Sequence, residues 1–529
     1  MSESARDPSH DTAGDDEPRP RLSAVRVAVA LAVIAGAAFG GVFAVRNRLE
    51  AGASPVRGTW FAPYVDATLS PTYEFQSPSD NPARQVALGF VVSKPGAPCS
   101  PSWGATGSLS DADQTLALGS RIAQLAQDGA TAIGSFGGRA NTDLAVGCTD
   151  VGALEAAYQT VIDAYHLRVI DLDVEGAGLQ DFAADQRRAE AIRAVEAVET
   201  LRHNPLGVWL TLPVEPTGLQ DGAVSLIDAM LAARVSLAGV NVMAMDFSAP
   251  APAGQTMLTQ VEAAASAAER QVADRFRRHG VALTPTQAWG RLGVTVMIGQ
   301  NDVEGELFST TDAEGLSGFA TKVGLARISM WSLNRDRQCG TAFARVGVNS
   351  NVCSGTPQAT LAFSHIFGQF NATPADSSGS TDVPPPPDTN PAHAPYPAWS
   401  PTAPYPAAYK VVRQGSIYEA KWYNSGQDPV TQVQYSWQTP WDLLGPVLPT
   451  DRAPTPVTTP GTDYPVWSSS RQYSAGDRVS FGGQPYSARW INQGASPADE
   501  ATDPYGSPWA PLFVVPGEPG APPTSAPGG

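Results

Sequence analysis

The chain has 529 residues, 42% of them hydrophobic, and a formal net charge of −17 at pH 7. This length suits two or more domains with a large buried core. The acidic balance argues against a nucleic-acid partner, which would need a basic face, and it leaves no polybasic patch for acidic lipid headgroups.

An uncharged stretch near the N-terminus, Val27 to Val45, lies between arginines. As a helix it would span about 28 Å, close to the roughly 30 Å hydrocarbon core of a bilayer. Because it is longer than the apolar run of most signal peptides, we interpret residues 27–45 as a transmembrane anchor, with a cleaved signal sequence as the alternative. Either way the bulk of the chain lies outside the cytoplasm, at the cell membrane or secreted. Residues 1–26 are expected to form a disordered cytoplasmic tail.

Between residues 58 and 370, short β-type runs alternate with Ala-rich helical segments. The runs are at residues 60–66, 86–92, 132–136, 169–175, 208–214, 240–246, 292–298 and 327–332. Eight strands alternating with helices predict an α/β fold, a (β/α)8 TIM barrel. Polar residues at the ends of these runs, Asp66, Ser135, Glu175 and Asp246, then lie at the carboxyl end of the barrel, where such folds carry their chemistry.

The run Leu167–Gly176 alternates acidic and aliphatic residues, which is the two-residue period of a β-strand. Asp171, Asp173 and Glu175 therefore share one face. Like charges repel, and partly buried carboxylates are costly unless they are used or paired. A metal site or a solvated edge strand would give the same pattern, but we favour a catalytic acid cluster. The histidines do not stand at ligand spacing from one another or from a cysteine, so we expect no zinc site.

The four cysteines allow three disulfide connectivities. We favour Cys99 with Cys148 and Cys339 with Cys353, because each pair lies within one region of the predicted barrel. The alternative, four free and buried thiols, is disfavoured by the predicted export of the chain.

A stretch rich in Pro, Ser, Asp and Thr, residues 371–395, is interpreted as an extended linker. After it the sequence repeats itself at a constant offset of 68 residues, as Trp399 and Trp467 illustrate. The repeat predicts two small all-β modules, at residues 396–446 and 464–513. Residues 514–529 are expected to be disordered.

Each module has more aromatic residues than so small a core can hide. For any single ring, a place in the core is as good an interpretation as a place on the surface. For the set we favour a binding face, since flat aromatic rings stack on sugar rings. The candidates are Trp399, Tyr405, Trp422 and Trp441 in the first module, and Trp467, Tyr473, Trp490 and Trp509 in the second.

Together these features resemble a family-18 glycoside hydrolase over residues 58–370. The modules resemble chitin-binding modules of carbohydrate-binding families 5 and 12. The hydrolase family's strand-four signature is Asp-x-x-Asp-x-Asp-x-Glu, and it falls on Arg168, Asp171, Asp173 and Glu175. The last three acids match and the first does not.

Three further motifs support the resemblance. The family's Ser-x-Gly-Gly matches Ser135–Gly138, and its Met-x-Tyr-Asp falls on Met243–Asp246 with Met245 in place of the tyrosine. The tryptophan that floors the family's central sugar subsite corresponds to Trp331. These motifs occur in the family's order, so the resemblance is specific.

The resemblance implies substrate-assisted, retaining hydrolysis of β-1,4-linked N-acetylglucosamine polymers, chitin or a related glycan. Glu175 would protonate the glycosidic oxygen, Asp173 would orient the attacking acetamido group, and Asp171 would share a proton with Asp173. Asp246 and Trp331 would contact the substrate, as would Ser135. No metal or organic cofactor is implied, and we expect a monomer.

Two departures from the family bear on activity. Arg168 replaces a supporting acid, from which we expect altered tuning rather than loss. Met245 replaces a tyrosine that donates to the acetamido carbonyl, and a thioether cannot donate. Gln300 or Asn301, at the end of the seventh predicted strand, is expected to supply the missing donor, and without it activity would be weak.

Two other functions compete with an extracellular chitinase. A non-hydrolytic, lectin-like barrel would normally lack the terminal glutamate, and Glu175 is present. A hydrolase of another acetamido glycan, such as cell-envelope or N-glycan material, gains weight from the predicted membrane anchor. The sequence leaves open whether cleavage is endo or exo and whether both modules bind.

Overall fold

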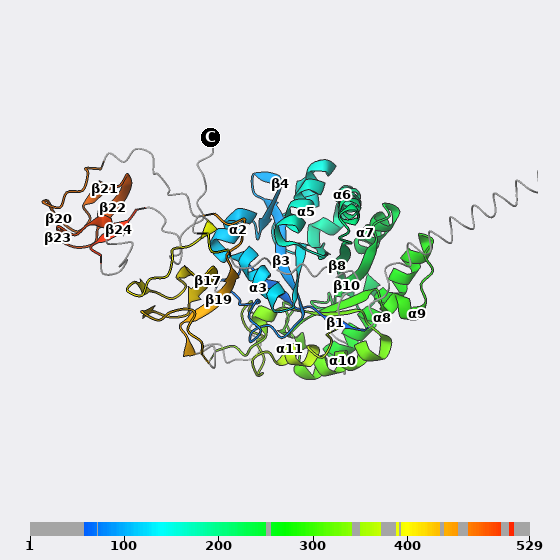
Figure 1. The fold of residues 1–529 in the computed structure, drawn as a ribbon. Coiled ribbons are helices and arrows are strands. Elements are labelled where there is room, and N and C mark those ends of the chain that lie inside the picture. The colour runs from blue at the N-terminus through cyan, green and yellow to red at the C-terminus, as the bar shows by residue number, and fades with distance from the viewer. Residues whose placement is uncertain are drawn as a thin grey trace, which may run out of the picture. The chain divides into compact units, whose positions relative to one another are not determined.

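The computed structural model describes residues 58–70, 72–249, 255–340, 350–371, 388–390, 393–433, 438–452, 464–498 and 507–512. The predicted membrane span at 27–45, both predicted disordered ends and most of the linker lie outside these residues. Within the described ranges, no helix has the length and apolar character needed to cross a bilayer. The described parts comprise a large α/β region followed by two small β-rich regions (Figure 1).

Eight parallel strands close into a barrel. The first is split into β1 (Trp60–Phe61), which pairs with the last strand, and β2 (Tyr64–Asp66), which pairs with the second. The others, in order around the barrel, are β3 (Gln85–Lys94), β6 (Thr131–Gly137), β7 (Val169–Asp173), β8 (Gly207–Glu215), β10 (Leu237–Met243), β11 (Leu292–Met297) and β14 (Arg327–Trp331). Each predicted run overlaps the strand at its place in the barrel, and the predicted TIM barrel is confirmed.

Short antiparallel strands extend two of the barrel strands or form a hairpin. They are β4 (Ala97–Trp103) and β5 (Gly107–Ser108) beside β3, β9 (Gly218–Leu219) beside β8, and the pair β12 (Gly299–Gln300) and β13 (Leu307–Phe308). These additions follow the carboxyl ends of barrel strands and therefore belong to the end that carries the acids.

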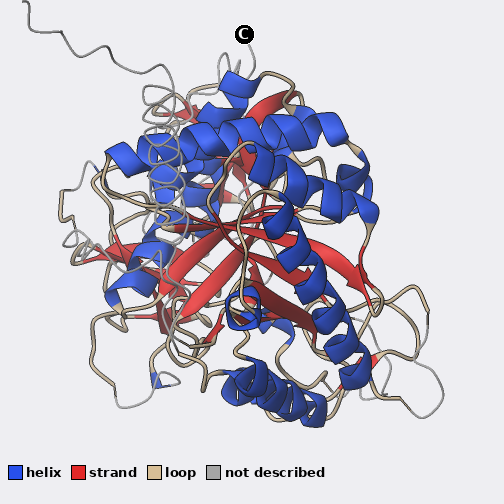
Figure 2. Ribbon diagram, turned by 90° about the vertical axis from the view of Figure 1, so that its right-hand side faces the viewer, coloured by secondary structure: helices blue, strands red, loops and turns tan. Residues whose placement is uncertain are grey.

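Helices surround the strands (Figure 2). They are α2 (Leu109–Leu116), α3 (Leu118–Gln127), α4 (Leu144–Gly147), α5 (Val151–Tyr165), α6 (Phe182–Leu201), α7 (Asp221–Ala232), α8 (Met257–Arg278), α9 (Pro285–Trp289), α10 (Thr310–Val323) and α11 (Ala362–Phe367), with the 3-10 turns η1 (Gly176–Gln180) and η2 (Leu333–Arg335). Polar N-caps set several helix starts. Asp150 accepts from the third backbone N–H of α5, and Ser309 forms a reciprocal capping box with Asp312 in α10.

Successive side chains of β7 point in opposite directions, so they pack into two different hydrophobic clusters. Ile170, Leu172 and Val174 belong to the large hydrophobic cluster shared with the helices. Val169 lies in a smaller cluster with Trp60 and with residues of other barrel strands. The acids have the same parity as Val169, so they point into the barrel. The strand ends at Asp173, and Glu175 follows it in extended conformation as the residue before η1.

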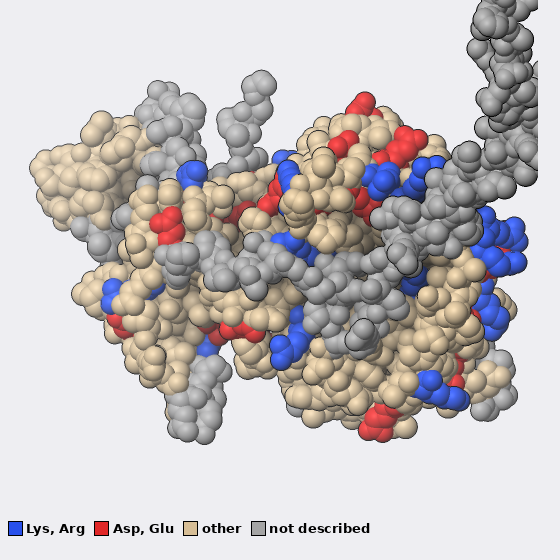
Figure 3. Space-filling view, turned by 45° about the vertical axis from the view of Figure 1, so that its right-hand side comes forward, with Lys and Arg blue, Asp and Glu red and all other residues tan. Residues whose placement is uncertain are grey.

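Charged side chains of both signs are interspersed over the part of the barrel seen in Figure 3. One dense group ends α8, where Asp274 pairs with Arg275, Arg277 and Arg278. The net negative charge is therefore not concentrated in a single acidic field on this face.

The two modules have the same topology. The first has β15 (Pro404–Tyr405) paired with β18 (Asn424–Ser425), and a sheet of β16 (Lys410–Arg413), β17 (Ser416–Ala420) and β19 (Trp441–Pro446). The second has β20 (Gln472–Tyr473) with β23 (Asn492–Gln493), and β21 (Arg478–Phe481), β22 (Gln484–Ala488) and β24 (Trp509–Pro511). The repeat in the sequence is thus a repeat in backbone topology.

The first module shares a hydrophobic cluster with the barrel. Its members are Ala117, which precedes α3, and Tyr396, Ile417, Leu444 and Val447 of the module. The hydroxyl of Tyr396 donates to the backbone oxygen of Gln114 at 2.5 Å. The hydrophobic cluster of the second module consists of that module's own residues.

Candidate active site

The three acids of the β7 segment are graded in depth. Asp171 is 0% exposed and Asp173 is 3% exposed, whereas Glu175 is partly exposed at the carboxyl end of the barrel. Because a β-strand rises about 3.3 Å per residue, each acid lies roughly 7 Å nearer the barrel mouth than the one before it. Only the outermost acid is open to a large molecule at the mouth.

Asp171 accepts four hydrogen bonds from four other strands. Oδ2 accepts from the hydroxyls of Tyr64 and Ser135, each at 2.8 Å. Oδ1 accepts from Thr211 Oγ1 at 2.6 Å and from Arg327 Nη1 at 2.8 Å. A carboxyl group whose two oxygens meet four donors is held as a hydrogen-bond acceptor, because a bound proton would oppose one of them.

Asp173 has a different environment from its buried neighbour. Its Oδ1 is buried and has no hydrogen-bond partner among the described residues. Burial raises the pKa of Asp173 well above its ordinary value, and the charges of Glu175 and Asp171 raise it further, while Arg327 lowers it. The neutral form of Asp173 is therefore favoured.

Glu175 combines access with a raised proton affinity. Burial raises its pKa from 4.5 to about 7; the charge of Arg139 opposes this rise, and those of Asp246 and Asp302 add to it. A carboxyl group with a pKa near neutrality can donate a proton and take it back at neutral pH. These properties suit a general acid and base.

The two glycines after Ser135 allow the ends of β6 and β7 to approach closely. A Cβ on Gly137 would lie 2.0 Å from the backbone oxygen of Asp173, and one on Gly138 would lie 2.9 Å from the ring of Phe90. Both glycines also have positive φ. A side chain at Gly137 would displace the strand that carries the acids, and one at Gly138 would displace the ring of Phe90.

Ser135 does not reach the mouth. It is 0% exposed and donates to Asp171. The prediction that Ser135 contacts the substrate is therefore wrong, because the inward parity of β6 at this level points its hydroxyl at the innermost acid. Ser135 acts on the substrate site only through that acid.

Trp331 is partly buried at the end of β14. Its ring stacks on that of Phe90, with centroids 5.6 Å apart, and lies 6.3 Å from the ring of Tyr64. The peptide bonds Gly89–Phe90 and Trp331–Ser332 are cis. The stacked pair forms a partly exposed apolar surface beside the acids, which suits contact with the apolar face of a sugar ring.

Asp246 and Met245 are both partly exposed at the end of β10. Asp246 has φ of 49°, and its Oδ1 accepts from the backbone N–H groups of Asp302 at 2.8 Å and Val303 at 3.2 Å. Burial and the charge of Asp302 raise the pKa of Asp246. Asp246 thus organises the loop after β12 and lies close enough to raise the pKa of Glu175.

Asn301 lies in that same loop, and Gln300 is the last residue of β12 before it. Asn301 is 1% exposed, and its amide donates to the backbone oxygens of Met297 at 2.8 Å and Gly299 at 3.1 Å. This burial contradicts a role for Asn301 as a donor to substrate. Gln300 is partly exposed, with its amide donating to Asn301 O at 3.2 Å and Val303 O at 3.4 Å, so the donor role stays a prediction for Gln300 alone.

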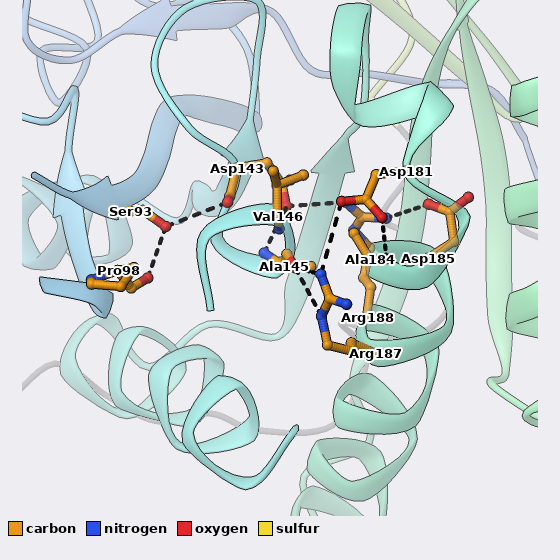
Figure 4. A network of polar contacts seen from close by, with 10 residues as sticks. All are labelled: Ser93, Pro98, Asp143, Ala145, Val146, Asp181, Ala184, Asp185, Arg187 and Arg188. Atoms are coloured by element: carbon orange, nitrogen blue, oxygen red, sulfur yellow. Dashed lines mark hydrogen bonds and ion pairs between the residues drawn. The ribbon is translucent and has the colours of Figure 1, made fainter. Parts of the chain in front are cut away.

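A buried ion-pair network holds the loop that follows β6 (Figure 4). Asp143 Oδ1 pairs with Arg188 Nη2 at 3.0 Å, and Arg188 Nη1 pairs with Asp185 at 2.7 Å. Ser93 Oγ donates to the backbone oxygen of Asp143 at 3.3 Å. The charge of Asp143 is also among those that raise the pKa of Asp173. The network therefore links the support of the loop to the electrostatics of the acids.

Two disulfides tie segments near this end of the barrel. Cys99 of β4 is bonded to Cys148, which ends α4, and Cys339 is bonded to Cys353. These are the two pairs favoured above. Within the described ranges, no group of three or more His, Cys, Asp or Glu side chains is arranged to hold a metal ion.

Half of the candidate aromatic residues of the modules are core residues. Tyr405, Trp441, Tyr473 and Trp509 are 3%, 3%, 1% and 0% exposed. The indole N–H groups of the two tryptophans donate to backbone oxygens, and each hydroxyl of the two tyrosines accepts a backbone N–H. These four rings fill the module cores, the interpretation that the sequence left open for any single ring, and their polar atoms are satisfied inside the modules.

The other four aromatic candidates differ in exposure. Trp399 and Trp467 are partly buried against their own module cores. Trp422 and Trp490 are 42% and 44% exposed. Next to them stand residues that the sequence analysis did not select, Tyr423 at 64% exposed and Ile491 at 63%. Each module therefore presents a pair of neighbouring exposed apolar side chains.

Several residues around the acids were not identified from the sequence. Tyr64, Thr211 and Arg327 all donate to Asp171. Strand parity in the sequence could have identified them. Arg327, for example, stands two residues before Ser329 and four before Trp331, so its side chain points into the barrel. Strand parity could not have predicted the position of Phe90, because β3 is irregular between Leu88 and Val91.

Known proteins resemble this barrel. The chain is 31% identical over 313 residues to the probable bifunctional chitinase/lysozyme of Escherichia coli strain K12, which covers 59% of the chain and 34% of that protein. It is 31% identical over 290 residues to endochitinase 11 of Metarhizium anisopliae, which covers 52% of each. The catalytic domain of a hyperthermophilic chitinase from Pyrococcus furiosus superposes with a TM-score of 0.50 and 24% identity, over 60% of the chain and 96% of that structure. The barrel is chitinase-like in sequence and in fold.

The extent of these similarities is limited. The chain spans about a third and about half of the length of the two curated relatives. No family model matches the chain. The solved chitinase structure establishes the fold of the chitinase-like barrel, and the activity of the whole chain is argued below from the site.

Proposed function

We propose that the chain is a glycoside hydrolase that cleaves β-1,4 links next to an N-acetylated sugar, in chitin or a related glycan. The observation that carries this proposal is the graded set of acids on the β7 segment. The innermost is saturated with donors, the middle one is buried with an unpartnered oxygen, and Glu175 is accessible with a pKa of about 7.

In the proposed reaction, Glu175 gives its proton to the glycosidic oxygen as the C1–O bond breaks. The carbonyl oxygen of the substrate's own acetamido group attacks C1 and forms a bicyclic oxazolinium ion. Asp173 orients the acetamido N–H and stabilises the positive charge that develops there. Glu175 then removes a proton from the water that attacks C1 as the bond between C1 and the acetamido oxygen breaks, so the anomeric configuration is retained and the enzyme returns to its starting state.

The substrate-assisted route fits the positions of the acids better than a route with an enzyme nucleophile. A retaining enzyme with two carboxylates needs both to face the anomeric carbon, about 5–5.5 Å apart. Asp173, the next acid after Glu175, is 3% exposed, so its access to a sugar carbon is restricted. An acetamido group that reaches inward can meet the buried acid, whereas C1 itself stays at the mouth.

Met245 is the weak point of the proposed site. It stands where the resemblance implies a hydroxyl donor to the acetamido carbonyl, and it has none. Gln300 remains the proposed replacement, since its side chain is partly exposed on a loop tied to Asp246. Loss of an unreplaced donor of this kind costs about 10²–10³ in rate.

The two modules are proposed to bind insoluble polymer through the exposed pairs Trp422–Tyr423 and Trp490–Ile491. Flat, solvent-exposed rings on small modules suit stacking on sugar faces. Linked binding sites raise the effective concentration of the barrel on a polymer. Residues 27–45 are proposed to anchor a monomeric chain in the membrane, with barrel and modules on the extracellular side.

A second candidate substrate is the peptidoglycan of a cell envelope. It has acetamido sugars in β-1,4 linkage, so the same acids would serve. The observation that favours it is the similarity to a protein described as a probable bifunctional chitinase/lysozyme. A purely binding function is disfavoured, because Glu175 has the exposure and pKa of a working acid.

The deciding experiment is hydrolysis of N-acetylglucosamine oligomers and of peptidoglycan by the purified chain and by its Glu175→Gln variant. Glu304→Gln is the matched control, since Glu304 is an exposed acid on the nearby loop. Cleavage of the oligomers by the parent and by the control, but not by the Glu175 variant, supports the chitinase. Cleavage of peptidoglycan alone supports the second candidate, and cleavage of neither substrate refutes both.

A further inference from the structure

A fully buried arginine lies inside the barrel below the proposed catalytic acids. Arg327 is 0% exposed and stands on β14 with the inward parity of Trp331. Its guanidinium carbon lies 5.2 Å from the ring centroid of Trp60, 5.4 Å from that of Tyr64 and 5.7 Å from that of Trp209. Cation–π contacts with three rings help to offset the cost of removing this charge from water.

The guanidinium is aimed at the innermost acid. Nη1 donates to Asp171 Oδ1 at 2.8 Å, and Nε donates to Ser329 Oγ at 2.7 Å. Both partners of this ion pair are 0% exposed. An ion pair that is this deeply buried gives little net stability by itself, so its presence calls for a reason other than packing.

We propose that Arg327 is a positioning residue for the acid cluster: it fixes Asp171 as a hydrogen-bond acceptor, so that Asp173 is the acid of this pair that is left to meet the substrate's acetamido group. The inference rests on the hydrolytic function proposed above. The two oxygens of Asp171 already meet four donors. Asp173 keeps a buried oxygen without a partner among the described residues, where an acetamido N–H fits.

The charged and titratable groups that face Asp173 come from several elements. Asp171 and Glu175 belong to its own segment, Arg327 to β14, and Asp143 to the loop after β6. The negative groups raise the pKa of Asp173, and Arg327 is the positive group that lowers it. The hydroxyl of Tyr64, on β2, bonds Asp171 rather than Asp173. Arg327 therefore weakens the hold of Asp173 on a proton.

The test compares Arg327→Met, which removes the charge, with Arg327→Lys, which keeps it without the planar fork. Arg121→Met is the matched control. Arg121 is also 0% exposed, but it lies on α3 and donates to Gln76 Oε1 at 2.9 Å. The measurements are kcat, KM and the pH profile of oligomer hydrolysis, with folding checked by circular dichroism.

For Arg327→Met, we expect kcat to fall about 10²-fold with little change in KM, since misplacing a reacting group costs this much. The acidic limb of the pH profile moves to higher pH, because Asp173, which acts as a carboxylate in the proposed reaction, loses a positive neighbour and holds its proton more tightly. Arg327→Lys keeps the limb near its original position, although kcat still falls. Arg121→Met lowers stability and leaves the limb unchanged.

A stability measurement tests the ion pair without relying on turnover. Removing Arg327 leaves the buried Asp171 carboxylate without its positive partner, so Arg327→Met should lose thermal stability relative to the parent. Adding Asp171→Asn to Arg327→Met removes the orphaned charge and should restore part of the loss. The double variant also serves if Arg327→Met alone does not fold.

The kinetic and the stability measurements together distinguish failure of the proposed hydrolytic function from failure of the positioning role of Arg327. If the parent cleaves no oligomer or peptidoglycan, the hydrolytic function fails, and the stability arm still decides whether Asp171 depends on Arg327. If the parent is active but Arg327→Met keeps the parent's acidic limb, Arg327 only supports the fold and the positioning role is refuted. The same conclusion follows if Asp171→Asn restores none of the stability that Arg327→Met loses.

Discussion

The barrel and the modules place their candidate functional groups in opposite ways. In the barrel, the groups are charges held largely out of water, with Asp171 and Arg327 both 0% exposed. In the modules, they are apolar side chains left in water, such as Trp422 at 42% and Tyr423 at 64%. Buried charges alter a chemical step, whereas exposed rings alter where the enzyme is held. Changes in the two regions should therefore separate turnover on soluble oligomers from binding to insoluble polymer.

The largest effect is expected at the accessible acid. Glu175→Gln keeps the shape of the side chain and removes the proton donor, so turnover of soluble oligomers should fall by about 10²–10⁴-fold. Binding to insoluble chitin should stay within a factor of about two, because the modules are untouched. Initial rates on oligomers and a pull-down on chitin measure the two quantities. A parallel loss of polymer binding would break the separation between the regions.

Asp173→Asn should come next. An amide cannot stabilise positive charge on the acetamido nitrogen as a carboxylate does, so kcat should fall about 10²–10³-fold with KM nearly unchanged. Steady-state kinetics on the same oligomers give the answer. An unchanged kcat would exclude Asp173 from the proposed mechanism while leaving Glu175 in place.

Within the modules, the buried and the exposed tryptophans should behave differently. Trp441→Ala removes a core ring and should destabilise the first module by about 3–5 kcal/mol, whereas Trp422→Ala should cost well under that. Trp422→Ala should instead weaken polymer binding by about 2 kcal/mol, or roughly 30-fold in Kd. Calorimetric unfolding and chitin-binding isotherms distinguish the two. Equal destabilisation by both changes would show that exposure does not mark the binding residues.

The architecture could be predicted from the sequence because it rests on short-range periods. Short β-type runs between Ala-rich helical segments marked every barrel strand, and the offset of 68 residues marked both modules. The residues that hold the acids in place were harder to predict from the sequence. A buried arginine such as Arg327 is unfavourable on composition alone, and only its parity with Trp331 placed it inside the barrel. Likewise, the repeat identified Trp441 and Trp422 equally, although one fills a core and the other meets solvent.

A smaller effect concerns pH and the stability of the barrel. The folded-state pKa of Glu175 is raised from 4.5 to about 7 by burial, so its neutral form is the one that the fold tolerates. A group with a raised folded pKa contributes stability at low pH that is lost as the pH rises from about 4.5 through about 7. Glu175→Gln should therefore be more stable than the parent at about pH 8 and indistinguishable from it at about pH 4. Thermal melts across this range test the sign of the stability difference between Glu175→Gln and the parent, and module variants should show no such pH-dependent difference.

The smallest effect should distinguish the two modules from each other. At the exposed pair, the first module has Tyr423 where the second has Ile491 at the same offset, with nearly equal exposure. A branched aliphatic side chain offers no flat face to a sugar, so Ile491→Tyr should strengthen polymer binding by about 1 kcal/mol, a few-fold in Kd. The reverse change, Tyr423→Ile, should weaken binding by a similar factor, and neither should alter turnover of soluble oligomers. If both substitutions leave the isotherm unchanged, the neighbouring tryptophan alone carries the stacking in each module, and the modules are equivalent despite their difference in sequence.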